Sequence, residues 1–448
     1  MEGWPEMTAG AGARAVGRFL FLFPIAFFSF LTTTLAGPAR GGLPALTLEE
    51  CLTIAEANHP SLAGAEAQAA AGRGRLAQTL AADRPEVSAT ASTARNGSDY
   101  DERSNYSVGA TASLKIFDAR RNQYAADAQR NTLSATEEEG RKTLQDVRAN
   151  VKSSYMTLLL SAETAVQKLE SARAFEQHLE QAKGFYEVGT KPWYDVTKAR
   201  VDLGTAQLAL VEAESGVEVA RAALRNAMGV GQETLFDVAP VSFDVLGLEE
   251  LWDLLRERGV EELERLALEN RPDYRAAELR ALAGRATLSA EARSTSPGVS
   301  LTGGYNGAGD DVSELEKSWN VGLRMSVPVL DGGAAKARVE TARAQLSSLA
   351  ATREKLRQDI SLEVRRAYTE IVKARERVRI SELTLANAEE NRKLALGRYE
   401  TGVGDSLEVT DALLSHAAAR LENRKARYDF QTALINTEKA IGTEFLSR

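Results

Sequence analysis

The most constraining feature of this chain is that one sequence pattern occurs in it twice. The segment from Phe185 to Leu203 matches the segment from Arg398 to His416, and corresponding residues lie 213 positions apart. Near the start of each copy, His59-Pro60 corresponds to Arg271-Pro272, 212 positions later. A repeat of this length far exceeds the roughly 20–50 residues of solenoid or propeller units. Each copy is therefore predicted to be a whole structural unit, and the two units are expected to lie side by side.

The beginning of the chain has the layout of a secretory signal peptide. Arg14 and Arg18 precede an apolar run over residues 19–31, and small residues follow. A basic start, a short apolar core and small residues at the cleavage site are typical of such peptides. The run is shorter than the roughly 20 apolar residues of a spanning helix, so a membrane anchor is the less favoured alternative. We expect export and cleavage between residues 37 and 41, and the start methionine, Met1 or Met7, stays open.

Capping residues are expected at the starts of the helices. Thr47 and Glu50 have the spacing of a capping box, and the alanine-rich sequence after them predicts one helix to about Ala82. Asp118 and Asp331 occupy matching positions in the two copies, just before the long helices. We expect both to be N-cap residues, because their carboxylates can accept hydrogen bonds from first-turn amides.

Two segments alternate apolar and polar residues with the period of a β-strand. They run from Tyr106 to Ile116 and from Trp319 to Val329, and each is expected to pair with a segment before it, Glu86 to Ala94 or Gly298 to Asn306. Alternation over about 11 residues matches the length of a transmembrane strand. The residues expected to face lipid are Val108, Leu114, Val321, Leu323 and Val327.

Four such strands are too few to form a closed barrel. The smallest membrane barrels have about eight strands, and an open edge in lipid leaves backbone groups unpaired. If these strands cross a membrane, several chains must share one barrel, and three chains would supply about 12 strands. The alternative is two soluble hairpins that pack against helices.

Long helices are predicted for the rest of each copy. No proline follows Pro328, and a heptad seam of aliphatic and small residues runs from Ile360 to Leu385. Turns are expected at Gly189–Pro192 and at Gly402–Asp405, because glycine readily adopts the backbone angles of a reversal. The predicted fold class is mainly α with a transmembrane β part. In it, a long α-helical hairpin barrel continues into a 12-stranded β-barrel that three chains share, four strands per chain.

The repeat and a change in composition after Met228 predict the domain organisation. The predicted parts are a signal peptide (1–39), a first repeat (45–229), an inter-repeat or equatorial segment (230–258), a second repeat (259–442) and a C-terminal tail (443–448).

Residues that carry catalytic chemistry are sparse and scattered. The three histidines, His59, His178 and His416, lie on separate predicted helices, and neither zinc-site spacing nor a phosphate-binding glycine loop occurs. Cys51, the single cysteine, is expected to be a small buried residue. The net charge of −8 argues against nucleic-acid binding. We therefore predict a protein that is not an enzyme and has no cofactor and no metal site.

The order of these features resembles the TolC-type outer-membrane efflux proteins. The pattern Tyr-x-x-Gly followed by Asp/Glu-Val-x-x-Ala occurs from Tyr186 to Ala199 and again from Tyr399 to Ala412. The resemblance covers essentially the whole mature chain and rests on the order and doubling of its features. It implies a homotrimer in the cell outer membrane, with a helical tunnel in the periplasm. The trimer would be a passive conduit in a tripartite efflux or type I secretion system, and a periplasmic adaptor and an inner-membrane pump would be its partners.

The resemblance also implies roles for residues near the two helix turns. Where the family's second turn has an arginine, this chain has Gly404, and Lys191 is the candidate replacement. Glu408 and Asp411 match a ring of acidic gate residues, although carboxylates at a helix start also favour the helix dipole. The residues implied for the periplasmic gate are Asp195, Tyr399, Glu408 and Asp411. Those implied for adaptor docking at the hairpin tips are Gly189, Thr190, Gly402 and Val403.

The alternative function is a soluble periplasmic coiled-coil adaptor or structural protein. Adaptors resemble this chain in having a helical hairpin, but they normally have one copy, flanked by β-rich domains. Two equal copies with membrane-length strands favour the channel. The transported substrate, whether a drug, a metal ion or a protein, and the class of pump stay open, because the pump selects the substrate.

Overall fold

A computed structural model describes residues 45–98, 101–240 and 245–443 of the chain. The predicted signal peptide lies outside these residues, as does the predicted tail from residue 444 onward. Among the helices in the described ranges, none is both long enough and apolar enough to cross a membrane.

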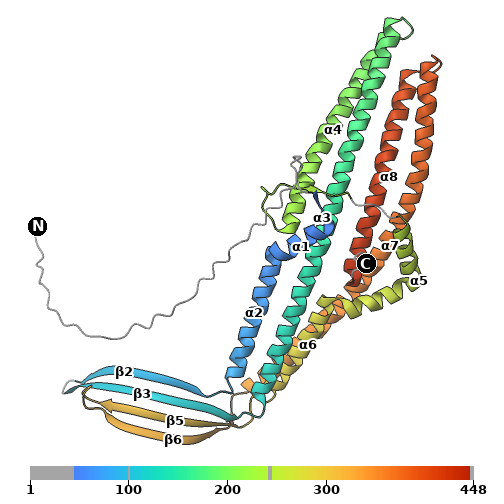
Figure 1. Ribbon diagram of the computed structural model, residues 1–448. Coiled ribbons are helices and arrows are strands. Elements are labelled where there is room, and N and C mark those ends of the chain that lie inside the picture. Colours follow the sequence, from blue (N-terminus) through green and yellow to red (C-terminus); the bar gives the residue numbers. More distant parts are fainter. Residues whose placement is uncertain (1–44, 99–100, 241–244, 444–448) are drawn as a thin grey trace, which may run out of the picture. The chain divides into compact units, whose positions relative to one another are not determined.

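The same order of elements occurs in both halves of the chain (Figure 1). The first half contains α1 (Leu48–Asn58), α2 (Pro60–Ala81), β2 (Glu86–Ser98), β3 (Asp101–Phe117), α3 (Arg121–Glu187) and α4 (Trp193–Met228). The second half contains α5 (Val245–Asn270), α6 (Pro272–Glu291), β5 (Gly298–Gly309), β6 (Glu316–Ser326), α7 (Ala334–Glu400) and α8 (Ser406–Ile441). A short parallel pair, β1 (Ala45–Leu46) with β4 (Asp237–Val238), joins the chain before α1 to the segment after α4.

The prediction of one helix from Thr47 to Ala82 is wrong, although its capping box is confirmed. The Thr47 amide donates to Glu50 Oε2 at 2.8 Å, and the Glu50 amide donates to Thr47 Oγ1 at 3.3 Å. The helix then breaks at His59, whose backbone is extended (φ −69°, ψ 122°), because Pro60 disfavours a helical conformation in the residue before it. Arg271, before Pro272, has almost the same angles (φ −70°, ψ 123°), so the break occurs in both copies.

The chain enters the two long helices through left-handed residues. These are Ala119 and Arg120 (φ 55° and 65°) before α3, and Gly332 and Gly333 (φ 63° and 90°) before α7. The N-caps are Arg120 and Gly333, so the prediction of Asp118 and Asp331 at the N-caps is wrong by two positions. Both aspartates still cap the helices from outside, because Asp118 Oδ2 accepts from the Asn122 amide at 2.9 Å and Asp331 Oδ2 from the Ala335 amide at 2.6 Å.

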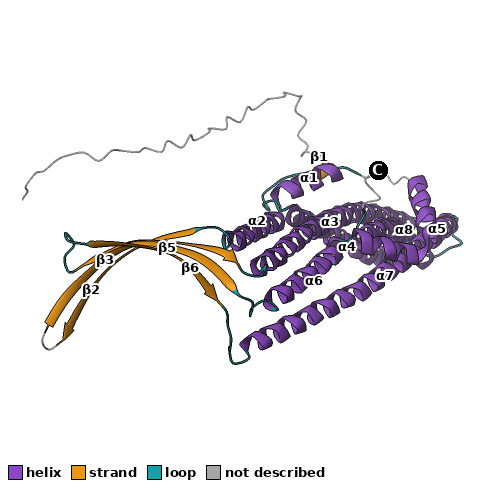
Figure 2. Ribbon diagram, turned by 90° about the horizontal axis from the view of Figure 1, so that it is seen from below, coloured by secondary structure: helices purple, strands orange, loops and turns teal. Residues whose placement is uncertain are grey.

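The four long strands form one antiparallel sheet in the order β2-β3-β5-β6 (Figure 2). The predicted pairs β2–β3 and β5–β6 are confirmed, and β3 pairs with β5 to join the two copies. Strands β2 and β3 extend beyond their predicted ends, whereas β6 ends at Ser326, so Val327 lies just outside the sheet. Within the described residues, β2 and β6 are edge strands that each lack a partner on one side.

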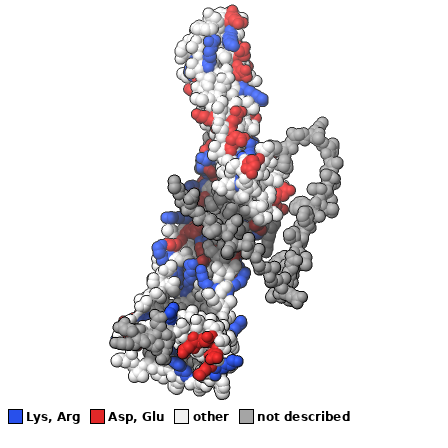
Figure 3. Space-filling view, turned by 90° about the vertical axis from the view of Figure 1, so that its left-hand side faces the viewer, with Lys and Arg blue, Asp and Glu red and all other residues white. Residues whose placement is uncertain are grey.

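The long helices pack in two hairpins. Helix α3 contacts α4, α7 contacts α8, and α3 contacts α8, so the lateral order is α4-α3-α8-α7. Exposed helix faces carry many ion pairs three or four residues apart, and Figure 3 shows acidic and basic side chains interspersed on the surface in view. Each such surface pair contributes little to stability, about 0.3–0.5 kcal/mol.

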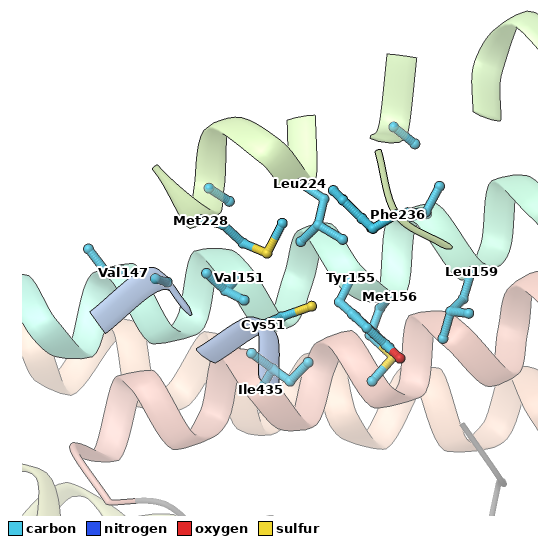
Figure 4. Close-up of a cluster of buried hydrophobic side chains, with 14 of the residues drawn as sticks. Cys51, Val147, Val151, Tyr155, Met156, Leu159, Leu224, Met228, Phe236 and Ile435 are labelled. Atoms are coloured by element: carbon cyan, nitrogen blue, oxygen red, sulfur yellow. The ribbon is translucent and has the colours of Figure 1, made fainter. Parts of the chain in front are cut away.

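The main apolar cluster holds α1 against α3, α4 and α8 (Figure 4). Cys51 is fully buried in it, as predicted, and lies near Val151 and Tyr155. The Tyr155 hydroxyl donates toward the carbonyls of Leu46 (3.1 Å) and Ala239 (2.6 Å), one residue on either side of the β1–β4 pair. The cluster therefore fixes the segment after α4 against the middle of the long helices. A second cluster packs α5 against α7 and α8 in the same way.

An ion pair is buried between the two copies, beside the main apolar cluster. Lys152 Nζ on α3 donates to Glu438 Oε2 on α8 at 2.9 Å. Their side chains are only 8% and 6% exposed, so the pair is shielded from water.

Candidate functional site

The turns at the ends of the two helical hairpins have the same backbone. Gly189 and Gly402 both adopt left-handed angles, with φ of 76° and 78°. In the first turn the Thr190 amide donates to the Phe185 carbonyl at 2.9 Å, and in the second the Val403 amide donates to the Arg398 carbonyl at 3.0 Å. The four predicted tip residues, Gly189, Thr190, Gly402 and Val403, are all exposed.

Tyr399 is the centre of the contact between the two hairpin ends. It is fully buried, and its ring meets the edges of His178 at 5.4 Å and Phe185 at 5.3 Å between centroids. Burial raises the pKa of Tyr399 to about 12, with a smaller contribution from the negative charge of Asp195. The pKa of Asp195 is raised too, mainly by burial, while the positive charge of Lys191 opposes the shift. The structure thus brings Asp195 and Tyr399, two of the predicted gate residues, into one buried contact.

Lys191 extends from the first turn to the second. Its Nζ donates to the Gly404 carbonyl at 2.8 Å and lies 5.0 Å from the centroid of the Tyr399 ring. Gly404 is itself buried, and a Cβ atom there would approach the backbones of Arg398 and Tyr399 to 3.1 Å. An arginine at position 404 would therefore force this turn to move, whereas a lysine at position 191 reaches the turn without a clash.

Glu408 and Asp411 lie apart from this buried contact. Glu408 Oε1 accepts from Arg398 Nε at 2.9 Å on the surface of the first turn of α8, and Asp411 is exposed one turn later. The Glu408 amide donates to Asp405 Oδ1 at 2.7 Å, so Asp405 is the N-cap of α8. The four predicted gate residues thus form two groups, one buried between the hairpins and one open to solvent.

Several buried polar residues between the hairpins were not predicted. His178 Nε2 lies 3.0 Å from Ser406 Oγ, and burial lowers the pKa of this histidine, although the charges of Asp202 and Asp195 oppose the shift. Thr410 Oγ1 donates to Asp202 Oδ2 at 3.1 Å. Ser406 and Thr410 are four residues apart on α8, so they share a face, and that spacing is the one signal in the sequence that could have indicated the contact.

The strand register divides the sheet into an apolar and a polar face. Val321 and Leu323 pair with Gly303 and Leu301, and Leu301 pairs in turn with Leu114. Directly paired residues point to the same side of a sheet, so these residues share one face. The other face carries hydroxyl pairs between β2 and β3: Ser88 with Thr111 and Ser92 with Ser107, both at 2.8 Å.

The predicted lipid-facing residues occupy the apolar face, with one exception. Val108, Val321 and Leu323 are exposed, with 55%, 69% and 68% of the side chain accessible, and Leu114 is half-buried. Val327 is the exception, because it lies one residue beyond β6.

Comparison with known proteins identifies the family. The model of the outer membrane efflux protein family matches residues 52–230 and 263–443, one match in each copy. The chain belongs to this family. CyaE of Bordetella pertussis is 26% identical over 396 residues, which cover 86% of this chain and 81% of CyaE. TolC of Vibrio cholerae is 23% identical over 418 residues, which cover 91% of this chain and 93% of TolC.

The fold is also that of solved channels of the family. A crystal structure of CusC matches with a TM-score of 0.79 at 22% sequence identity, over 92% of this chain and 96% of CusC. The predicted fold class, a helical tunnel with a β part, is thereby confirmed. The family also confirms the predicted function. The chain is a passive outer-membrane efflux channel and not an enzyme, its helices form the periplasmic part, and it works as one component of a larger efflux system.

Proposed function

We propose that three copies of the chain assemble into one channel-tunnel, which receives substrates from an inner-membrane pump through a periplasmic adaptor. The observation that carries the proposal is the open sheet, with an apolar and a polar face and two unpartnered edges at β2 and β6. Such edges in lipid leave backbone groups without hydrogen bonds. Pairing β6 of one copy with β2 of the next satisfies both edges, and three copies supply about 12 strands.

The edge helices support the same assembly. Helices α4 and α7 are the outer members of the order α4-α3-α8-α7, and both carry exposed aliphatic side chains. Residues 7 and 18 positions apart point to nearly the same side of a helix, which gathers the exposed residues of α4 into one stripe. The exposed residues are Val201, Leu208 and Val219 on α4 and Ile380, Leu383 and Leu394 on α7. Packing α4 of one copy against α7 of the next would remove both stripes from water.

The hairpin tips are the proposed docking surface for the adaptor. Around Gly189, Thr190, Gly402 and Val403 lie several large apolar side chains that are open to solvent. Among them, Val188 and Val403 are 71% and 72% exposed, and Tyr194 is 70% exposed. Grouped exposed apolar residues are typical of protein interaction sites. The adaptor of this system is thus proposed to contact both turns of each chain.

The gate is proposed to lie at the same end. The buried contact of Asp195 and Tyr399 would hold the two hairpins together in the closed state. Glu408 and Asp411, open to solvent on α8, would recur around the axis of a threefold assembly and attract cations there. The two copies are proposed to span 45–229 and 259–442, with the equatorial segment 230–258 between them.

The assembly is tested by placing a charge on each face of the sheet. Leu323→Arg puts a guanidinium on the proposed lipid face, where it costs about 2–4 kcal/mol at mid-membrane depth. We expect this variant to lose outer-membrane trimers, as measured by membrane fractionation and by the mass of the detergent-extracted protein. The matched control, Arg324→Leu, changes the neighbouring residue on the opposite face and should keep wild-type trimer levels. Normal amounts of trimeric Leu323→Arg protein, or a stable wild-type monomer, would contradict the shared barrel.

A further inference from the structure

A cavity of about 180 Å³ lies between the two copies, part of the way along the helical hairpins. Helix α3 forms one wall with Glu170 and Ser171, α7 contributes Arg392, and α8 contributes His416 and Arg420. A water molecule takes up about 30 Å³ in the liquid, so the cavity has room for a small polyatomic solute. It lies outside the buried contact around Tyr399 and shares no lining residue with it.

Arg392 has no partner for its charge in this cavity. Its Nε atom is buried and makes no hydrogen bond, and no ion pair of its guanidinium occurs within the described parts of the chain. The nearest acidic residue on its own helix, Glu389, is occupied by Lys393, whose Nζ lies 3.0 Å away. A guanidinium stays charged at any physiological pH and offers five N–H donors. A buried donor that finds no acceptor costs about 1–3 kcal/mol, so this site lacks an acceptor.

The other charged groups of the cavity leave it positive. Arg420 forms an ion pair with Glu170, which cancels one charge of each sign and leaves Arg392 in excess. His416 lies in the same positive field: its pKa is lowered, mainly by burial and then by the charges of Arg392 and Arg420, while Glu389 and Glu170 oppose the shift. An uncompensated cation next to a neutral imidazole and a serine hydroxyl attracts an anion that can accept several hydrogen bonds.

We propose that this cavity binds a small oxyanion, a phosphate or a carboxylate, with Arg392 as its principal ligand and with Arg420, His416 and Ser171 around it. The bound anion would connect α3 of the first copy with α7 and α8 of the second. It would thus add an ionic link between the copies in a region where the described helices otherwise meet through side-chain packing. The proposal does not depend on the number of chains in the assembly or on the adaptor.

The site can be tested through His416, because the chain has only three histidines. The imidazole signals of the detergent-solubilised full chain are followed by NMR as a function of pH, and His416→Gln identifies the signal of residue 416. Inorganic phosphate and acetate form the two arms, each against chloride at equal ionic strength to remove general screening. We expect phosphate, acetate or both to raise the pKa of His416 by about 1 unit, since a nearby opposite charge favours the protonated form.

Arg392→Gln and Lys393→Gln make the test specific. Without added anion, Arg392→Gln should raise the pKa of His416, because a neighbouring cation is gone, and this shift also shows that the variant is folded. Phosphate or acetate should then no longer move that pKa. Lys393→Gln removes the same charge one position along α7, outside the cavity lining, and should respond as the wild type does. The proposal is overturned if neither anion moves the pKa of His416 in the wild type, or if Arg392→Gln responds as strongly as the wild type.

Discussion

Lys191 links the two hairpin ends of one chain through a single ammonium group. It reaches the Gly404 carbonyl, lies over the Tyr399 ring and is the nearest positive charge that acts on Asp195. A lysine suits this place because its compact ammonium can donate to one carbonyl without the planar geometry that an arginine needs. The arginine that the family resemblance leads one to expect in the second turn is therefore replaced by a cation from the first turn.

Removing the Lys191 charge should loosen the closed end of the tunnel. Lys191→Met keeps the length of the side chain but loses a charged hydrogen bond worth about 1.5–3 kcal/mol. Because about 1.4 kcal/mol corresponds to a factor of ten, the ratio of open to closed channels should rise roughly tenfold or more. Single-channel recording in planar bilayers measures this as a higher resting conductance. Lys183→Met, which removes a surface lysine paired with Glu180, is the control. A Lys191→Met channel as quiet as this control would show that the turn contact does not hold the gate.

At the scale of elements, α3 and α8 are joined by the buried Lys152–Glu438 pair. Helix–helix contact between the copies elsewhere involves polar groups such as His178 and Ser406, but this pair is fully charged and shielded from water. Taking two charges out of water costs free energy, so a buried pair fixes the rotation of its helices more than it adds stability.

Breaking the pair on one side should be much worse than replacing both partners. Glu438→Ala leaves an uncompensated Lys152 and should destabilise the chain by about 3–5 kcal/mol. Lys152→Met combined with Glu438→Leu should recover most of that loss, because apolar side chains of similar size suit a buried site. Unfolding of the purified protein by heat or denaturant measures the order of the variants. A double variant as unstable as Glu438→Ala would show that the pair adds net stability.

The elements could be predicted from the sequence better than the contacts between them. Period-2 alternation and the repeat located the strands and both helical hairpins, because these patterns are local. The break at His59 was missed, although Pro60 is a local signal, because the alanine-rich sequence on both sides suggested continuity. The contacts of Lys152 with Glu438 and of His178 with Ser406 join residues more than 200 positions apart. They depend on how each helix is rotated about its axis, which alanine-rich seams leave open.

At the scale of the whole molecule, the unpartnered edges predict how copies meet along the helices. Leu208 on α4 is 61% exposed in one chain, and burying a leucine side chain contributes about 1.5–3 kcal/mol. Leu208→Asp should therefore reduce the fraction of trimer in dilute detergent, measured by native mass spectrometry, while it leaves the fold of each chain intact. Gln207→Asp adds the same charge at the neighbouring exposed position and should leave the trimer unaffected. Equal loss of trimer in both variants would argue that charge, rather than the apolar stripe, matters there.

The left-handed entries into α3 and α7 show how far the two copies have diverged since one unit was duplicated. The backbone is the same at Ala119-Arg120 and at Gly332-Gly333, yet only the second copy has residues that adopt it without a steric penalty. A residue with a Cβ atom costs roughly 1–2 kcal/mol in this conformation. The first copy thus keeps side chains at positions where the fold favours glycine, and the second copy carries the less strained version of the same turn. An internal duplication of this kind contains its own ancestral comparison, since each half records a solution to the folding problem that the other half also had to solve.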